Sequence, residues 1–236
     1  MFDHVDITVS DLAAGRAFYH AARRRSVDDD FCRLDQSTRA STEIGGVGVR
    51  KIVVYELVSL DGVAEAPDTF FTDWDDAMDA NLAGIIAKQD VVILGRRSYG
   101  EWARFWPTSD IQPFAAFINA VTKHIATSRP LDQDWPNATA IDGDLVEFVR
   151  ALKKTRGGDI GVHASISVAQ ALLAADVVDE LRLVIAPAIA GRGRRLLDGL
   201  PSIQLESIRT ETSPTGYLLA DYRVIPQSAK PRQSTF

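Results

Sequence analysis

The hydrophobic positions between residues 51 and 225 follow two periods, which predict strands that alternate with helices. Short apolar runs rich in valine, isoleucine and leucine are typical of buried strands. Such runs occur at residues 52–58, 91–94, 123–127, 138–141, 160–163 and 181–186. Apolar residues at helical spacing predict intervening helices at about residues 80–88, from 98 onward, over 145–152 and over 167–175.

Two longer strands, near residues 204–212 and 217–225, close this part of the chain. The segment between them, Ser-Pro-Thr-Gly, contains turn-forming residues, so we predict an antiparallel hairpin. The whole pattern predicts an α/β fold, in which a mixed, mostly parallel sheet has helices on both faces and ends in this hairpin. Ligands of such sheets bind at the carboxyl ends of the strands.

The first fifty residues have a different pattern. Residues 2–9 predict a short strand, and Ser10 and Asp11 can cap a helix that extends to about residue 22. Clusters of basic, acidic and glycine residues follow without a sustained hydrophobic period. We therefore expect a βα segment (1–22), a poorly ordered linker (23–50), one α/β domain (51–225) and a flexible tail (226–236).

Composition and charge narrow the class of protein. The 236 residues suffice for one α/β domain and a short appendage. The net charge is −6, and the basic residues are scattered among carboxylates, so we expect no nucleic-acid partner. The single cysteine, Cys32, cannot form an internal disulfide, and no apolar signal segment or membrane-length run is visible. We expect a cytoplasmic protein with a small-molecule substrate and no membrane partner, and we leave a homodimer open.

The strongest candidate for a ligand site is the segment 93–101. A buried strand there reaches Gly95 and continues into a helix that we expect Ser98 and Glu101 to cap. The free amides at such a helix N-terminus can bind an anion, and Arg96 and Arg97 flank them. Alternatively, Gly95 only makes the turn and both arginines are solvated.

Two other strand ends carry polar residues. Ser128 and Arg129 follow one strand, although a lone Ser-Arg pair is more typical of a turn. Another strand ends at Ala164 and Ser165, before a helix for which Ser167 and Gln170 predict a second capping box. Two such junctions indicate a cofactor with several phosphates, yet many α/β domains have them without any ligand.

Single polar and aromatic residues leave more than one interpretation. Asp61 follows the first strand, where a carboxylate can orient a substrate or deliver a proton, or can simply form the turn before Gly62. His163 ends an apolar strand, which favours a structural, hydrogen-bonded histidine. Trp102 and Trp106 suit packing, although an aromatic ring can also stack on a nicotinamide.

Three segments resemble the dihydrofolate-reductase-like superfamily, and more closely the C-terminal reductase domain of the riboflavin-biosynthesis deaminase-reductase. They are Val-Ser-Leu-Asp-Gly at 58–62, Gly-Arg-Arg-Ser-Tyr at 95–99, and residues 172–193, where Val-Asp-Glu-Leu-Arg-Leu precedes Ala-Pro and two glycines. The resemblance extends over residues 51–225. It implies a three-layer dihydrofolate-reductase-like fold and an NADPH-dependent reductase of a small heterocyclic or sugar-derived substrate. The nearest named activities are 5-amino-6-(5-phosphoribosylamino)uracil reductase and dihydrofolate reductase.

The resemblance also implies roles for individual residues. After Gly95, the family's arginine and serine meet the 2′-phosphate and pyrophosphate of NADPH, and these roles would fall to Arg96 and Ser98, beside Arg97. Ser128 or Arg129 would lie near the same 2′-phosphate, because guanidinium groups bind phosphate well.

Asp61 would orient the substrate or relay a proton. Relatives have Gly-Gly or Gly-Ser where this chain has Ala164 and Ser165. A Cβ therefore stands where backbone and cofactor approach each other, which weakens the case for tight cofactor binding.

Residues 1–22 resemble the first βα unit of glyoxalase and bleomycin-resistance proteins, in which His4 would be a metal ligand. One such unit cannot fill a coordination shell, so we expect no metal. One cysteine also cannot supply the paired cysteines of a zinc deaminase domain. Two alternatives stay open: a non-catalytic domain that keeps the fold and binds a nucleotide or a partner, and a metal-dependent lyase or resistance protein. The physiological substrate is not specified by the sequence.

Overall fold

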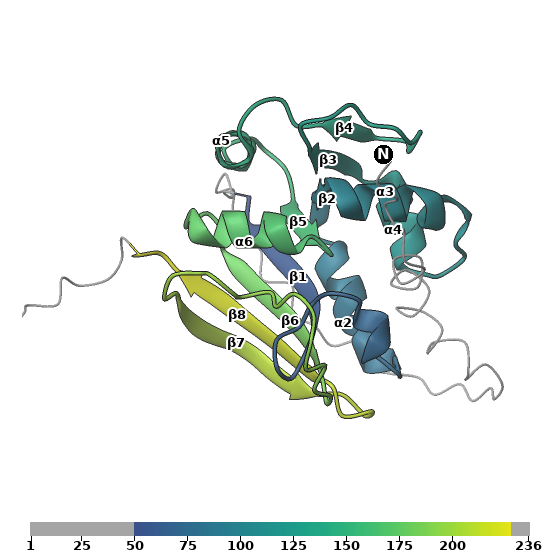
Figure 1. Cartoon of the computed structure of the whole chain (residues 1–236), viewed down its shortest axis with the longest axis vertical. Helices are drawn as coiled ribbons and strands as arrows, with labels where there is room; N and C mark the ends of the chain where they lie inside the picture. Colours follow the sequence, from purple (N-terminus) through teal and green to yellow (C-terminus); the bar gives the residue numbers. More distant parts are fainter. Residues whose placement is uncertain (1–49, 228–236) are drawn as a thin grey trace, which may run out of the picture.

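The computed structural model describes residues 50–227, which form an eight-stranded sheet covered by helices (Figure 1). The strand order is β4-β3-β2-β5-β1-β6-β8-β7. The strands are β1 (Ile52–Ser59), β2 (Gln89–Gly95), β3 (Thr122–Ala126), β4 (Ala138–Ala140), β5 (Asp159–His163), β6 (Glu180–Ala186), β7 (Gln204–Thr212) and β8 (Leu218–Ile225). All pairs from β4 across to β6 are parallel, and β8 is antiparallel to both β6 and β7. The predicted mixed sheet and C-terminal hairpin are confirmed.

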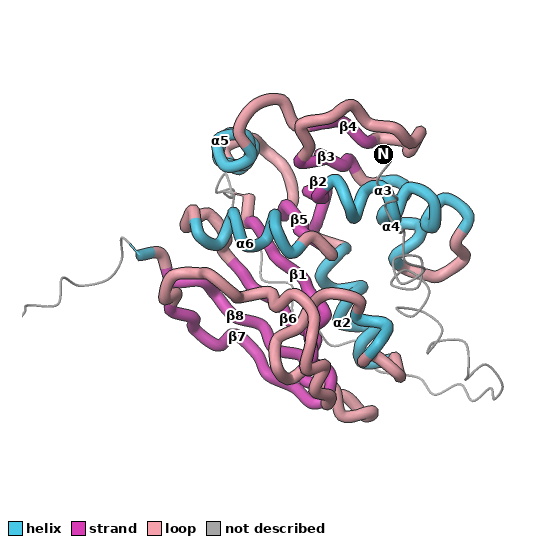
Figure 2. The backbone as a smooth tube through the Cα atoms, viewed as in Figure 1, coloured by secondary structure: helices cyan, strands magenta, loops and turns pink. Residues whose placement is uncertain are grey.

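Helices cover both faces of the sheet, which gives three layers (Figure 2). The helices α2, α3 and α4 pack on one face, and α5 and α6 pack on the other. Their bounds are α2 (Asp76–Ile86), α3 (Arg96–Phe105), α4 (Phe114–Ala120), α5 (Leu145–Lys153) and α6 (Ile166–Ala174), with 3-10 turns η2 (Pro67–Thr69) and η3 (Trp106–Thr108).

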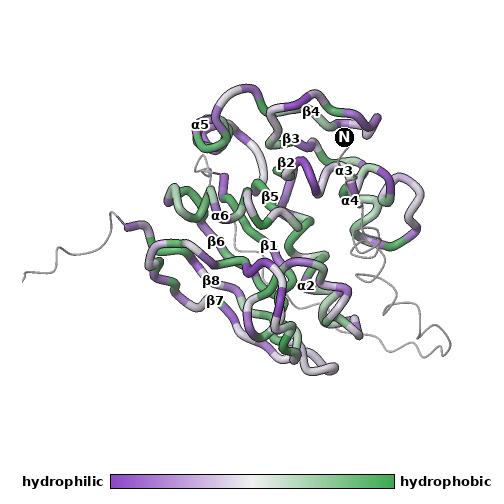
Figure 3. Tube along the Cα trace, in the orientation of Figure 1, coloured by the Kyte–Doolittle hydropathy of each residue, from purple (hydrophilic) through white to green (hydrophobic). Residues whose placement is uncertain are grey.

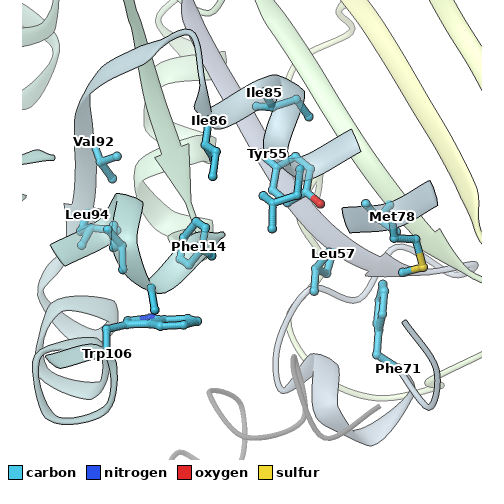
Figure 4. Close-up of a cluster of buried hydrophobic side chains, with 14 of the residues drawn as sticks. Tyr55, Leu57, Phe71, Met78, Ile85, Ile86, Val92, Leu94, Trp106 and Phe114 are labelled. Carbon is cyan, nitrogen blue, oxygen red and sulfur yellow. The ribbon is translucent and has the colours of Figure 1, made fainter. Parts of the chain in front are cut away.

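The central strand β1 supplies side chains to both cores, because successive residues of a strand point to opposite faces. Tyr55 and Leu57 pack against α2 and the aromatic residues near α4 (Figure 4). Ile52 and Val54 pack on the other face, toward α5 and α6. Each fully buried side chain of this size contributes roughly 1.5–3 kcal/mol. Figure 3 shows the hydrophobic segments gathered on the central strands and on the helices that cover them.

Helix α3 begins at Arg96, two residues before the predicted start, and Gly95 is its N-cap residue. Ser98 therefore lies inside the first turn, and its hydroxyl donates to the backbone oxygen of Ala164 at 2.5 Å. Glu101 instead accepts from Arg97 one turn earlier, at 3.1 Å. The predicted capping box is wrong, because the serine has a partner in another part of the fold.

The second predicted capping box is also wrong. Ser165 is the N-cap residue of α6, and its side chain does not cap the helix. Gln170 donates its amide to the backbone oxygens of Arg195 and Asp198, at 3.1 and 3.3 Å. Both helices thus begin without the side-chain caps that the sequence suggested.

The described domain begins at Arg50, one residue before the predicted boundary. Arg50 is buried, forms an ion pair with Asp90, and donates to the backbone oxygen of Gly158 at 2.8 Å. The predicted βα segment at 1–22, with His4, almost all of the linker and most of the tail lie outside the described residues. Within residues 50–227, no helix is long and apolar enough to cross a membrane.

Candidate functional site

The strands β2 and β5 are parallel neighbours in the sheet, but the helices that follow them lie on opposite faces. After Gly95, α3 packs into the core that holds Tyr99. After Ala164, α6 packs into the other core through Val168 and Leu172. A crevice opens at such a point, outside the carboxyl ends of the two strands, and it is where ligands of open α/β sheets bind.

A cavity of about 460 Å³ occupies this crevice, a volume within the range of small-molecule sites. One part of its wall is aromatic and comes from Trp102, Trp106, Phe114 and His163. The rest comes from the starts of α3 and α6, from β1 and from two loops; the polar residues among these are Glu56, Glu65, Arg96, Arg97, Ser98, Glu101, Ser165, Ser167 and Arg194.

Two serines join the two strand-to-helix junctions. Ser165 Oγ accepts from the amide of Gly95 at 3.0 Å and donates to Ser98 Oγ, also at 3.0 Å. Ser98 in turn donates to the backbone oxygen of Ala164. Both serines line the cavity as predicted cofactor contacts would, yet their hydroxyls are already used in holding α3 and α6 together.

Neither α3 nor α6 has a side-chain hydrogen bond at its N-cap. The first-turn amides of a helix have no acceptor within the helix, and they carry the positive end of its dipole. Because both helices start on the cavity wall, two sets of such amides face one space. This arrangement suits an anion with more than one phosphate.

The predicted arginines Arg96 and Arg97 line the cavity, but both are engaged with the protein. Arg96 donates to the backbone oxygen of Pro130 and pairs with Asp132, each at 2.6 Å. Arg97 pairs with Glu65 and with Glu101, both at 3.1 Å. Arg96 therefore fixes the loop after β3, and Arg97 is largely neutralised.

Arg194 is a cation of the cavity wall that the sequence reasoning missed. Its guanidinium donates to Ser167 Oγ at 2.8 Å, in the first turn of α6. The available signal was the run Gly-Arg-Gly-Arg-Arg at 191–195, which overlaps the end of the segment that carries the family resemblance. Arg194 adds positive charge beside the amides at the start of α6.

Ser128 and Arg129 line a second, more open hollow beside the cavity. The two spaces share the wall residues Ala126 and Leu145. Within residues 50–227, the guanidinium of Arg129 has no hydrogen bond or ion pair, since only its backbone contacts Thr127. The exposed carboxylate of Asp142 lines the same hollow. Arg129 is thus available for an anionic group of a ligand that extends out of the cavity.

Ala164 adopts a left-handed backbone conformation with φ 46°. A residue with a Cβ is disfavoured in this region by about 1 kcal/mol relative to glycine. The residue is exposed on the cavity wall, where relatives have glycine by the resemblance stated above. The methyl group therefore stands in the crevice in a conformation that suits glycine better.

Asp61, the predicted catalytic residue, does not contribute to the cavity wall. Its carboxylate accepts from Ser59 Oγ at 2.7 Å and from the amides of Ala190 and Gly191 at 2.9 and 3.0 Å. These hydrogen bonds lower the pKa of Asp61 to about 2. Its position is therefore suited to joining the turn after β1 to a distant loop, and not to contacting a ligand in the cavity.

Glu56 is a buried carboxyl group of the cavity wall that sequence reasoning missed. It is 4% exposed, and its Oε1 accepts from the amide of Ser165 at 3.0 Å. Burial raises the pKa of Glu56 to about 8. The hydrogen bond from Ser165 lowers the pKa, but this effect is smaller than that of burial. The available signal was an ionisable residue inside an otherwise buried, largely apolar strand.

His163 is buried, and its Nε2 lies 2.8 Å from Gln89 Oε1. Burial lowers the pKa of His163 to about 3, so the ring is neutral and donates to the glutamine. The predicted structural, hydrogen-bonded histidine is confirmed. Trp106 is also buried and packs edge-on against Trp102, which confirms both tryptophans as packing residues that additionally line the cavity.

A sequence model of the RibD C-terminal domain matches residues 50–219. The chain belongs to this family. As a RibD C-terminal domain protein it is similar to an uncharacterised Bacillus subtilis protein, YyaP, with 26% identity over 189 residues, which cover 73% of this chain and 94% of that one.

The fold of this chain is similar to that of several solved structures. A protein of Shewanella sp. PV-4, whose name links it to riboflavin biosynthesis, has a TM-score of 0.62 and 17% identity, covering 74% of this chain and 99% of its own. The Thermotoga maritima diaminohydroxyphosphoribosylaminopyrimidine deaminase/5-amino-6-(5-phosphoribosylamino)uracil reductase has a TM-score of 0.56 and 14% identity, covering 75% of this chain and 57% of its own. A pyrimidine reductase-like protein of Corynebacterium diphtheriae has a TM-score of 0.52 and 17% identity, with coverages of 75% and 92%. The predicted reductase-like domain with a dihydrofolate-reductase-like fold is confirmed.

Proposed function

We propose that this RibD C-terminal domain protein is an NADPH-dependent reductase of a small heterocyclic or sugar-derived substrate. The observation that supports it most directly is the crevice between β2 and β5, into which two helices without side-chain caps direct their first turns. A dinucleotide has a pyrophosphate that matches these amides.

The residues of the site fit such a cofactor. The amides at the starts of α3 and α6 would hold the pyrophosphate, and Arg194 would add positive charge beside α6. Arg129, with Ser128 next to it, would meet the 2′-phosphate in the second hollow. Arg96 would act indirectly, because it fixes the loop that carries Arg129.

When bound, NADPH supplies the hydride. The side chains Trp102, Trp106 and Phe114 give the cavity an apolar wall, which suits a flat ring and limits the access of water. The name of the Thermotoga relative includes a reductase of 5-amino-6-(5-phosphoribosylamino)uracil, a substrate that contains a flat pyrimidine ring. The substrate proposed for this chain is therefore of the ribosylaminopyrimidine or pterin class.

The test is a fluorescence titration of the protein with NADPH, followed by assays of NADPH oxidation with a panel of ribosylaminopyrimidines and pterins. We expect saturable binding and oxidation with at least one member of the panel. Absence of NADPH binding would overturn the proposal.

Ala164 favours a second candidate, a non-catalytic domain that keeps the fold and binds a nucleotide or a partner. Its methyl group and its left-handed conformation both oppose a close approach of the cofactor to the backbone. Saturable NADPH binding without oxidation by any compound of the panel would support this candidate over the reductase.

A further inference from the structure

Glu56 places an isolated carboxyl group inside the cavity. It lies on the central strand β1, on the face that α6 covers, and only 4% of the residue is exposed. One oxygen accepts the amide of Ser165, the residue directly before α6. The other oxygen, Oε2, has no hydrogen-bond partner among the described residues, and Glu56 belongs to the cavity wall. Glu56 Oε2 is not among the buried side-chain atoms that lack a partner, so it is accessible from the cavity, where a bound ligand can contact it.

The surroundings of Glu56 favour its neutral form. Burial raises its pKa to about 8, and no charged side chain contributes to this shift. The other ionisable groups that line the cavity beside it are Tyr55, Glu65, Glu101, Arg96, Arg97, Arg194 and His163. Glu65 and Glu101 pair with Arg97, and Arg96 pairs with Asp132. Arg194 donates to Ser167, and its charge does not contribute to the pKa shift of Glu56. Burial raises the pKa of Tyr55 and lowers that of His163, so both are neutral. At neutral pH the carboxyl group therefore keeps its proton.

We propose that Glu56 is a cofactor-binding residue that acts as a carboxylic acid: Oε1 accepts from Ser165, and the protonated Oε2 donates to an oxygen of the dinucleotide, on its pyrophosphate or the adjoining ribose. This inference rests on the proposed function. Its location follows from Ser165, because the amides that come next in the chain are those assigned to the pyrophosphate. An ionised Glu56 would lose the donor and place a negative charge beside the phosphates.

The affinity for NADPH should therefore fall as the pH rises through the pKa of Glu56. The experiment is a fluorescence titration with NADPH between about pH 6.5 and pH 9.5, on the wild type and on Glu56→Gln. Glutamine keeps an acceptor for Ser165 and a donor for the ligand, but it cannot ionise. We expect the wild-type Kd to increase at least about tenfold over this range and the Kd of the variant to stay nearly constant. Glu206→Gln, which removes an exposed carboxylate from β7 at the far edge of the sheet, should behave as the wild type.

Linkage gives a second readout that needs no substrate. If NADPH binds the protonated form, bound NADPH must raise the pKa of Glu56, which carboxyl carbon NMR of the wild type can follow. A wild-type Kd that is independent of pH, or the same pH dependence in Glu56→Gln, would overturn the inference and leave the proposed function intact. Absence of NADPH binding even at the lowest pH would overturn the proposed function, and this inference with it.

Discussion

Glu56 and Asp61 belong to one strand and the turn that follows it, yet their surroundings give their carboxyl groups opposite properties. Burial raises the pKa of Glu56, whereas hydrogen bonds lower that of Asp61. The amides that bind Asp61 come from Ala190 and Gly191, far away in the sequence. Local sequence reasoning cannot see such partners, which is why it selected the carboxylate in the turn and overlooked the one in the strand.

Replacing Glu56 with glutamine should stabilise the protein at neutral and alkaline pH. The folded-state pKa of about 8 lies above the ordinary value of 4.5, so the folded state binds the proton more tightly than the unfolded state does. The corresponding stability is complete below about pH 4.5 and is lost as the pH rises toward about 8. The free energy of unfolding of Glu56→Gln, relative to the wild type, should increase over this range by about 1.4 kcal/mol per pH unit, which amounts to up to about 5 kcal/mol.

Urea unfolding at several pH values between these limits measures this difference. Glu206→Gln, an exposed residue paired with Arg223, serves as the control and should show no comparable trend. A stability difference between Glu56→Gln and the wild type that does not change with pH would contradict the prediction.

Arg129 should determine the preference for NADPH over NADH. Within residues 50–227 its guanidinium has no partner and can meet the 2′-phosphate, so Arg129→Ala should weaken NADPH binding by about 1–3 kcal/mol and leave NADH binding nearly unchanged. Asp142 lines the same hollow with the opposite charge, so Asp142→Asn should increase the preference for NADPH. Titrations of both variants with both cofactors measure the ratio. If Arg129→Ala lost as much affinity for NADH as for NADPH, the result would contradict this assignment.

At the scale of single elements, the hydrophobic pattern located the strands and most helices because it depends only on neighbouring residues. The helix α4 (Phe114–Ala120) was missed, since seven residues are too few to establish a helical period. The start of α3 was misplaced for a different reason. Ser98 has the chemistry of a cap, but in the fold its hydroxyl bonds to Ala164 across the crevice.

The junction between β5 and α6 gives a prediction at this scale. Ala164→Gly should tighten NADPH binding by roughly 1 kcal/mol, because it removes a methyl group from the crevice and relieves the left-handed conformation. The relieved strain should offset the greater entropy of the unfolded chain, so the melting temperature should change little. Affinity and melting temperature are measured on the same variant. Unchanged NADPH affinity would count against a cofactor at this junction and favour the non-catalytic candidate.

At the scale of the whole molecule, the family match and the described domain begin at the same residue, Arg50. A chain that lacks residues 1–49 should therefore fold cooperatively, with NADPH binding and melting temperature close to those of the full chain. Calorimetry and the NADPH titration test this.

A truncation that also removes Arg50 provides the matched comparison. It leaves the carboxylate of Asp90 without its ion pair and the backbone oxygen of Gly158 without a donor. It should unfold at a lower temperature than the chain that keeps Arg50. A large loss of stability already in the first truncation would show that the N-terminal segment is part of the folded unit.

The order of the sheet also has a consequence for synthesis of the protein. The strand β1 is the first in the described domain, but its neighbours β5 and β6 come late, with Ile52 aligned to Ile160 and Val53 to Glu180. During translation the most apolar strand leaves the ribosome long before either partner exists, and contacts between distant residues form slowly. Until β6 has emerged, β1 has at least one unpaired edge and exposed apolar side chains, and in that interval it is a target for chaperones and for aggregation.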